Sequence, residues 1–192
     1  MALLAALLLA SCGTDAPGRR ATSYLDEKTG ATITHVEKPL VLFSDDPARA
    51  ANARDYIYAA PLSVNQSGKR SWWLWLGLWS TLDRGAAVGD DQRPDIVAIQ
   101  LLVDGEPMEL DIGTRADSIQ GVGHLPYTTP VATARNILLP LTGSQATRLS
   151  RGARIAIHTE MTSGAALLWQ PWIGTGNQTA FAERSWQAPP AD

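Results

Sequence analysis

The sequence predicts a mainly β protein, a β-sandwich with a few short helices. The chain has 192 residues, which suits one domain. Its composition is 45% hydrophobic and 18% charged, so it can fill a core. Glycine, proline, asparagine and aspartate recur at short intervals between segments rich in Ile, Val, Leu, Thr and Trp, a pattern typical of many short strands. An immunoglobulin-like arrangement is one candidate, and an open sheet backed by the small helices is the alternative.

Nine segments of the chain fit the strand pattern, and turn residues separate them. Asn65-Gln66-Ser67-Gly68 and Asp104-Gly105 each lie between two apolar runs, which predicts two hairpins with positive φ in the turn. The nine predicted strands are Thr32–Val36, Leu40–Phe43, Tyr56–Val64, Trp72–Thr81, Asp95–Val103, Met108–Ile112, Val131–Leu139, Arg154–Met161 and Ala166–Ile173.

Three short helices are also expected, none long enough to cover a sheet alone. The candidates are Ala48–Arg54 after the Asp46-Pro47 pair, a turn or two through Leu149 capped by Thr142 or Ser144, and Thr179–Trp186. We therefore expect a single globular domain at residues 24–187 and a disordered tail at residues 188–192.

The N-terminus carries the most specific motif. Ala2–Ala10 contains only uncharged apolar or small residues, and is far shorter than the ~20 residues of a membrane-spanning helix. It suits the apolar region of a secretory signal. Directly after it, Leu9-Ala10-Ser11-Cys12 resembles the lipobox of bacterial lipoproteins.

This resemblance implies where the protein is located. Residues 1–11 would be a signal peptide that is removed, and Cys12 would be the lipidated residue, carrying diacylglycerol and an amide-linked acyl chain such as palmitate. Residues 12–23 would be a flexible tether to the membrane. Gly13 follows the cysteine where an aspartate would favour the inner membrane, so the resemblance favours the outer membrane, on its periplasmic or surface face. The whole chain is similar to many uncharacterised lipoproteins of Gram-negative genomes.

Seven tryptophans are the most unusual feature of the composition. In a strand over residues 71–80, Trp73, Trp75 and Trp79 share one face, while Trp72 and three leucines share the other. A strand that is apolar on both faces is predicted to be central and covered on both sides, by the small helices, a partner protein or a planar ligand. The three rings either fill the core, form a platform on which sugar rings stack, or anchor at a membrane interface.

The sequence offers no complete catalytic constellation. His35, His124 and His158 stand in no recognised metal spacing, and the single cysteine cannot form a thiolate zinc site alone. His158 and Glu160 alternate onto one strand face, a pattern that suits metal binding, acid–base chemistry or an ordinary solvated face. We predict no catalytic residues, no metal and no cofactor, and keep as an alternative a hydrolase that uses His124 or His158 with a carboxylate.

These observations favour a non-catalytic protein of the cell envelope. The near balance of 16 basic and 19 acidic residues lacks the charge of a nucleic-acid binder. We expect a binding or scaffolding role through protein contacts, with the membrane as a second partner through the lipid on Cys12. The alternative is a glycan- or peptidoglycan-binding module that uses Trp73, Trp75 and Trp79.

Overall fold

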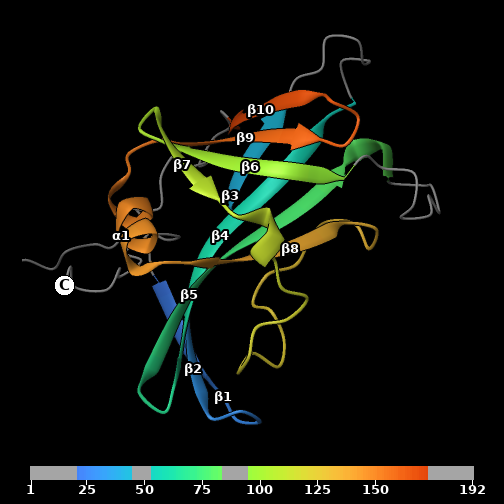
Figure 1. The fold of residues 1–192 in the computed structure, drawn as a ribbon. Helices are drawn as coiled ribbons and strands as arrows, with labels where there is room; N and C mark the ends of the chain where they lie inside the picture. Colours follow the sequence, from blue (N-terminus) through green and yellow to red (C-terminus); the bar gives the residue numbers. More distant parts are fainter. Residues whose placement is uncertain (1–20, 45–52, 84–94, 173–192) are drawn as a thin grey trace, which may run out of the picture.

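The structure is a computed structural model, and it describes residues 21–44, 53–83 and 95–172. The described chain is mainly β, with ten strands joined in one antiparallel sheet and a single α-helix (Figure 1). The predicted fold class, a β-sandwich-like arrangement with few helices, is confirmed.

Each of the nine predicted segments contains a strand. The predicted strand Val131–Leu139 begins too early, because Arg135 is the first residue that pairs. The strands are β1 Ala21–Asp26, β2 Ala31–Val36, β3 Leu40–Ser44, β4 Asp55–Gln66, β5 Lys69–Ser80, β6 Ile96–Val103, β7 Glu106–Leu110, β8 Arg135–Leu141, β9 Ile155–Met161 and β10 Ala166–Pro171.

The first strand, β1, corrects the predicted tether. Residues 21–23 belong to this strand and pair with β2, so the domain starts before residue 24. The segment was missed because Ala21-Thr22-Ser23 contains no large apolar residue, and its strand conformation depends on pairing along β2.

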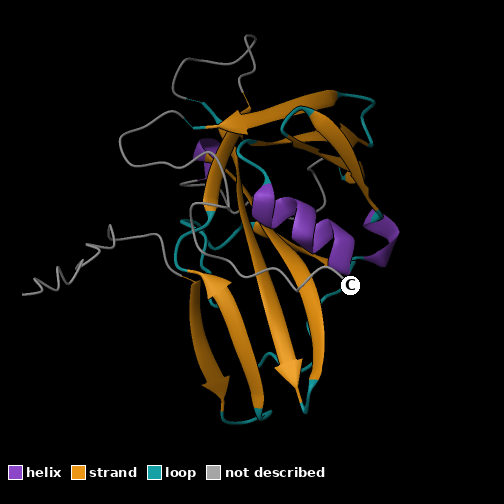
Figure 2. Cartoon of the chain, turned by 90° about the vertical axis from the view of Figure 1, so that its left-hand side faces the viewer, coloured by secondary structure: helices purple, strands orange, loops and turns teal. Residues whose placement is uncertain are grey.

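The strands form two layers that are parts of one sheet. The first layer holds β1, β2, β3, β4, β5 and β8; β2 and β3 lie end to end along the same edge of β4. The second layer holds β10, β9, β6 and β7. Strand β10 pairs with β9 through its first residues and with β3 through Gln170 and Pro171, so it joins the layers (Figures 1 and 2).

Both predicted hairpin turns form as the sequence indicates. Ser67 and Gly68 have φ angles of 51° and 82°, and Asp104 and Gly105 have 56° and 85°. Two consecutive positive φ angles match the twist of the flanking strands. The first turn sets the register of the longest hairpin, β4–β5, from Gln66↔Lys69 to Asp55↔Ser80.

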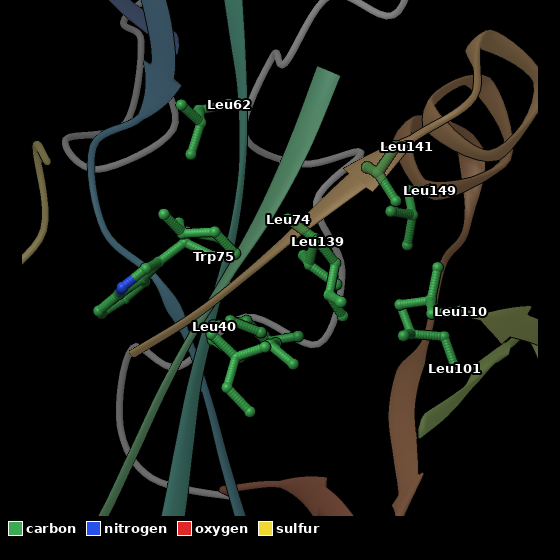
Figure 3. Close-up of a cluster of buried hydrophobic side chains, with 14 of the residues drawn as sticks. Leu40, Leu62, Leu74, Trp75, Leu101, Leu110, Leu139, Leu141 and Leu149 are labelled. Carbon is green, nitrogen blue, oxygen red and sulfur yellow. The ribbon is translucent and has the colours of Figure 1, made fainter. Parts of the chain in front are cut away.

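The main core lies between the two layers. Leucine and isoleucine side chains of β3, β4, β5 and β8 meet those of β6, β7 and β9, with Leu149 of the helix at one side (Figure 3). The residues of this core labelled in that view are Leu40, Leu74, Leu101, Leu110, Leu139, Leu141 and Leu149. Leu62 and Trp75, also labelled, are buried on the other face of the first layer.

The α-helix, α1, covers Gly143–Arg151, so its cap is Thr142, one of the two predicted candidates, and it extends two residues beyond Leu149. The Thr142 hydroxyl accepts from the Gln145 N–H, and the Gln145 side chain accepts from the Thr142 N–H, which together form a capping box. Two single-turn 3-10 helices, η1 (Thr81–Asp83) and η3 (Ile112–Thr114), complete the described elements. The predicted helix Thr179–Trp186 and all but the last two residues of Ala48–Arg54 lie outside the described residues.

Candidate functional site

The tryptophans of β5 lie on one face, as the alternation predicts. Trp73, Trp75 and Trp79 stand opposite Leu62, Ala60 and Tyr56 of β4, on the side of the first layer that faces away from the second layer. Among the described elements, helix α1 does not cover this outer face around Trp75, because its buried residues Ala146 and Leu149 belong to the core between the layers. Its cover is the segment of residues 115–134, between η3 and β8, which we call the cover loop.

Trp75 is part of the core. Its exposed fraction is 0%, its ring stacks on Tyr127 of the cover loop with centroids 4.9 Å apart, and its indole N–H donates to Asn136 Oδ1 over 2.9 Å. The Tyr127 hydroxyl in turn donates to the Pro61 carbonyl. A sugar could stack on Trp75 only by displacing Tyr127. Trp73 is half-buried, and its indole N–H donates to the Ser71 hydroxyl.

A row of rings continues from Tyr127 across the first layer. His35 meets Tyr127 edge-on, with ring centroids 5.5 Å apart, and meets Tyr24 edge-on at 5.8 Å. The ring of His124 stacks on the same Tyr24 at 5.9 Å. The structure therefore brings together two histidines that lie far apart in the sequence. Their shared contact is a tyrosine of β1, the strand that sequence reasoning missed.

Asp26 anchors the cover loop beside this row. One carboxylate oxygen accepts from the Gly123 N–H over 2.7 Å, and the other accepts from the N–H groups of Lys28 and Thr29. These bonds, above all that from Gly123, hold the pKa of the Asp26 carboxyl below its usual range. The carboxylate is thus engaged by backbone donors, and the arrangement fixes the loop on the β1–β2 hairpin.

The third histidine lies apart from the other two. His158 is on β9, opposite Gln100 and Leu168, and Glu160 lies two residues further on the same face of the second layer. Within the described residues, no three potential metal-ligating side chains gather into one site. In the same ranges, no helix has the length and apolarity needed to cross a membrane.

A second aromatic group lies on the outer face of the first layer, at the end of β4 opposite the Ser67-Gly68 turn. We call it the aromatic cluster. Tyr56 stacks on Trp79 at 4.6 Å, and Tyr58 meets the same indole edge-on at 5.7 Å. Trp172 packs edge-on against Phe43 at 5.3 Å and against Tyr56 at 6.0 Å. Four separate segments of the chain, β3, β4, β5 and the residue after β10, therefore converge here.

A positive charge lies over these rings. The Arg54 guanidinium carbon is 5.0 Å from the centre of the Trp172 ring and 5.8 Å from that of Phe43, a cation–π geometry. Trp79 is 6% exposed, while the other four rings are half-buried. The aromatic cluster consequently presents ring edges and a cation beside a buried indole.

The indole N–H of Trp79 is a buried donor that has no hydrogen-bond partner among the described residues. Such a group costs about 1–3 kcal/mol if nothing satisfies it. A partner whose carbonyl or hydroxyl accepted a hydrogen bond from this nitrogen would therefore be stabilised more than by a hydrogen bond from a donor that water already solvates.

The sequence contained a signal for this cluster that the prediction did not use. The Ser67-Gly68 turn fixes the register of β4 and β5, and counting back from it places Tyr56 opposite Trp79 and Tyr58 opposite Gly77. Phe43 and Trp172 could not be found in this way, since their positions depend on the pairing of β3 with β10.

Comparisons of the chain with protein-family models, with curated proteins and with solved structures found no match. The fold and the site therefore define the protein only by its architecture. It is a two-layer antiparallel β domain with an aromatic cluster, covered by Arg54, on its outer face. Cys12, the predicted lipidation site, lies outside the described residues.

Proposed function

We propose that this chain is a lipid-anchored protein of the bacterial cell envelope that binds another protein and catalyses no reaction. The observation that carries the binding role is the aromatic cluster with Arg54 above it. Tryptophan, tyrosine and arginine dominate the energetics of protein–protein interfaces, because they bury a large area and keep a polar group available. All three residue types meet here within one half-buried group.

The geometry favours a protein partner over a glycan. A sugar ring stacks on an open aromatic face, but Tyr56 covers one face of Trp79 and Tyr127 covers one face of Trp75. The rings of the aromatic cluster meet largely edge to face around Arg54. Apolar side chains and backbone carbonyls of a protein suit such a surface, because they can pack on ring edges and accept from buried donors.

The anchor is proposed from the lipobox resemblance at Cys12. In the native host, we expect labelled palmitate to be incorporated into the wild-type chain, and the Cys12→Ala variant to take up none and to leave the membrane fraction or remain as precursor. A Ser23→Ala variant is the matched control, since it changes a small polar residue outside the motif. Equal labelling of the wild-type and Cys12→Ala chains would refute the anchor.

Binding is tested by mild-detergent purification of the tagged chain from its host, followed by mass spectrometry. We expect a stoichiometric envelope protein to co-purify with the wild type, and its yield to fall at least tenfold with Phe43→Ala, which removes a ring of the aromatic cluster. Val97→Ala is the control, since Val97 is an exposed apolar residue of β6. Thermal unfolding of each variant verifies the fold.

Two results would contradict the proposed binding site. One is equal recovery of the partner with the folded Phe43→Ala variant. The other is the absence of any stoichiometric protein together with a change in tryptophan fluorescence when muropeptides are added, which would favour the glycan-binding alternative.

A further inference from the structure

The described sheet has three strands with only one strand neighbour, namely β1, β7 and β8. Such an edge presents a row of outward N–H and C=O groups that can pair with another chain. In an antiparallel sheet, successive residues point these groups alternately toward the neighbour and away from it. The Ser67-Gly68 and Asp104-Gly105 turns fix which residues point outward on each of these edges.

The edge of β7 is occupied by the helix. Val103 and Glu106 close the two-residue Asp104-Gly105 turn, so Pro107 and Glu109 point outward. Arg148 of α1 donates to the Pro107 carbonyl over 3.1 Å, and Gln145 donates to the Glu109 carbonyl over 3.1 Å. Pro107 also has no N–H to donate to a neighbouring strand.

The edge of β8 is protected in a similar way. The Ser67-Gly68 turn makes Gln66 and Lys69 a hydrogen-bonded pair, and the alternation continues from there through β5 to β8. The backbone groups of Asn136, Leu138 and Pro140 therefore point outward. The Ala116 N–H donates to the Leu138 carbonyl over 2.9 Å, and Pro140 has no N–H. Both edges thus carry a proline and a donor from another segment.

The edge of β1 has neither protection. The same count places the backbone groups of Thr22, Tyr24 and Asp26 toward β2, so those of Ala21, Ser23 and Leu25 point outward. No strand, helix or loop of residues 21–44, 53–83 and 95–172 pairs with this outer edge. The strand contains no proline and no lysine.

The side chains of β1 also leave the edge accessible. Its one charged residue, Asp26, is buried and bound to the Gly123 N–H. Leu25 is 61% exposed, which is high for a leucine in a strand. A six-residue edge without proline, lysine or a free charge lacks the features that usually prevent one strand from pairing with another.

We propose that β1 pairs antiparallel with β1 of a second copy of this chain, centred on Ser23. In this register Ser23 faces Ser23 of the partner subunit, and Leu25 faces Ala21 of the partner subunit. All three outward positions of each copy are then used, and each residue pair exchanges two N–H···O bonds. A register shifted by two residues leaves one outward position of each copy unpaired.

The self-complementary sequence is the reason to assign a second copy to this edge. The symmetric register brings no charged side chain opposite a like charge, and it packs the exposed Leu25 against a small residue that leaves room for it. The contact is isologous and closes with two chains, so it yields a dimer with one continuous sheet and no fibre. The inference does not depend on a lipid at Cys12 or on a partner for the aromatic cluster.

The test measures the mass of the full chain in mild detergent by sedimentation, corrected for bound detergent. We expect a dimer for the wild type and for Ser23→Ala, and a monomer for Ser23→Pro. Both variants lose the hydroxyl contact with Thr34, but only proline removes the outward N–H, and no bond to β2 uses that N–H. A monomeric wild type, or a dimer of the folded Ser23→Pro chain, overturns the proposal.

A disulfide test reports the register independently of mass. Antiparallel neighbours at the centre of the dimer lie within the ~7 Å limit between Cα atoms for a disulfide. Ser23→Cys should therefore cross-link into a covalent dimer under mild oxidation. Thr34→Cys, directly beside it on β2, lies one strand spacing of ~4.8 Å further from the axis in each copy and should not. Equal cross-linking of the two variants would refute pairing through β1.

Discussion

Replacing Gly77 by alanine is expected to destabilise the domain by about 3 kcal/mol, at the upper end of the usual cost of overpacking. A Cβ at this position would lie 2.7 Å from the Thr129 methyl group and 2.7 Å from the Trp75 ring. Neither neighbour can move freely, since Trp75 is held by Asn136 and Tyr127, and the Thr129 hydroxyl donates to the Val131 carbonyl. Urea-induced unfolding, followed by circular dichroism, measures the change in free energy.

The double variant Gly77→Ala with Thr129→Ala is the control for this prediction. Removing the Thr129 methyl group relieves one of the two contacts, so the double variant should regain part of the lost stability while the clash with Trp75 persists. If Gly77→Ala alone is as stable as the wild type, the cover loop does not pack on β5 as described.

Replacing Tyr127 by alanine should cost about 3–4 kcal/mol, in the range of large aromatic truncations. The substitution removes the ring that stacks on Trp75 and the hydroxyl that donates to Pro61. It also opens one face of Trp75 to solvent, so the tryptophan emission should shift to the red and become accessible to iodide. Unfolding in urea and fluorescence quenching measure the two effects.

The conservative variant Tyr127→Phe separates these contributions. It keeps the stacked ring and loses only the hydrogen bond, so we expect a cost of about 1 kcal/mol and unchanged quenching. Equal unfolding free energies for the Tyr127→Ala chain and the wild type would show that Trp75 does not depend on the cover loop.

Local signals in the sequence were sufficient for nine of the ten described strands and for the two predicted hairpin turns. Alternating apolar residues and the Ser67-Gly68 and Asp104-Gly105 pairs predict β4 to β7, because a two-residue turn fixes both the hairpin and its register. The cap of α1 at Thr142 was equally readable, since the Gln145 side chain stands three residues later. In each case the interacting groups are close in the chain.

The parts that escaped prediction depend on contacts between distant residues. The polar segment of β1 is a strand only because β2 supplies its pairing partners. The cover loop has no periodic pattern, and its position follows from Tyr127 on Trp75 and Asp26 on Gly123. For the aromatic cluster, Trp79 was identified as a candidate, but Phe43 and Trp172 come together only when β10 closes the sheet.

The position of β10 also determines when folding can be completed. Strands β3 and β9 are its two neighbours, and residues 166–171 lie near the end of the described chain. During synthesis from the N-terminus, the sheet cannot link its two layers until β10, the last strand of the described chain, has left the ribosome. A nascent chain that cannot close its core remains unfolded, which is the state in which a secreted precursor can be threaded through a translocation pore. For the exported protein proposed above, this order of strands leaves the chain in that state until synthesis of β10 is complete.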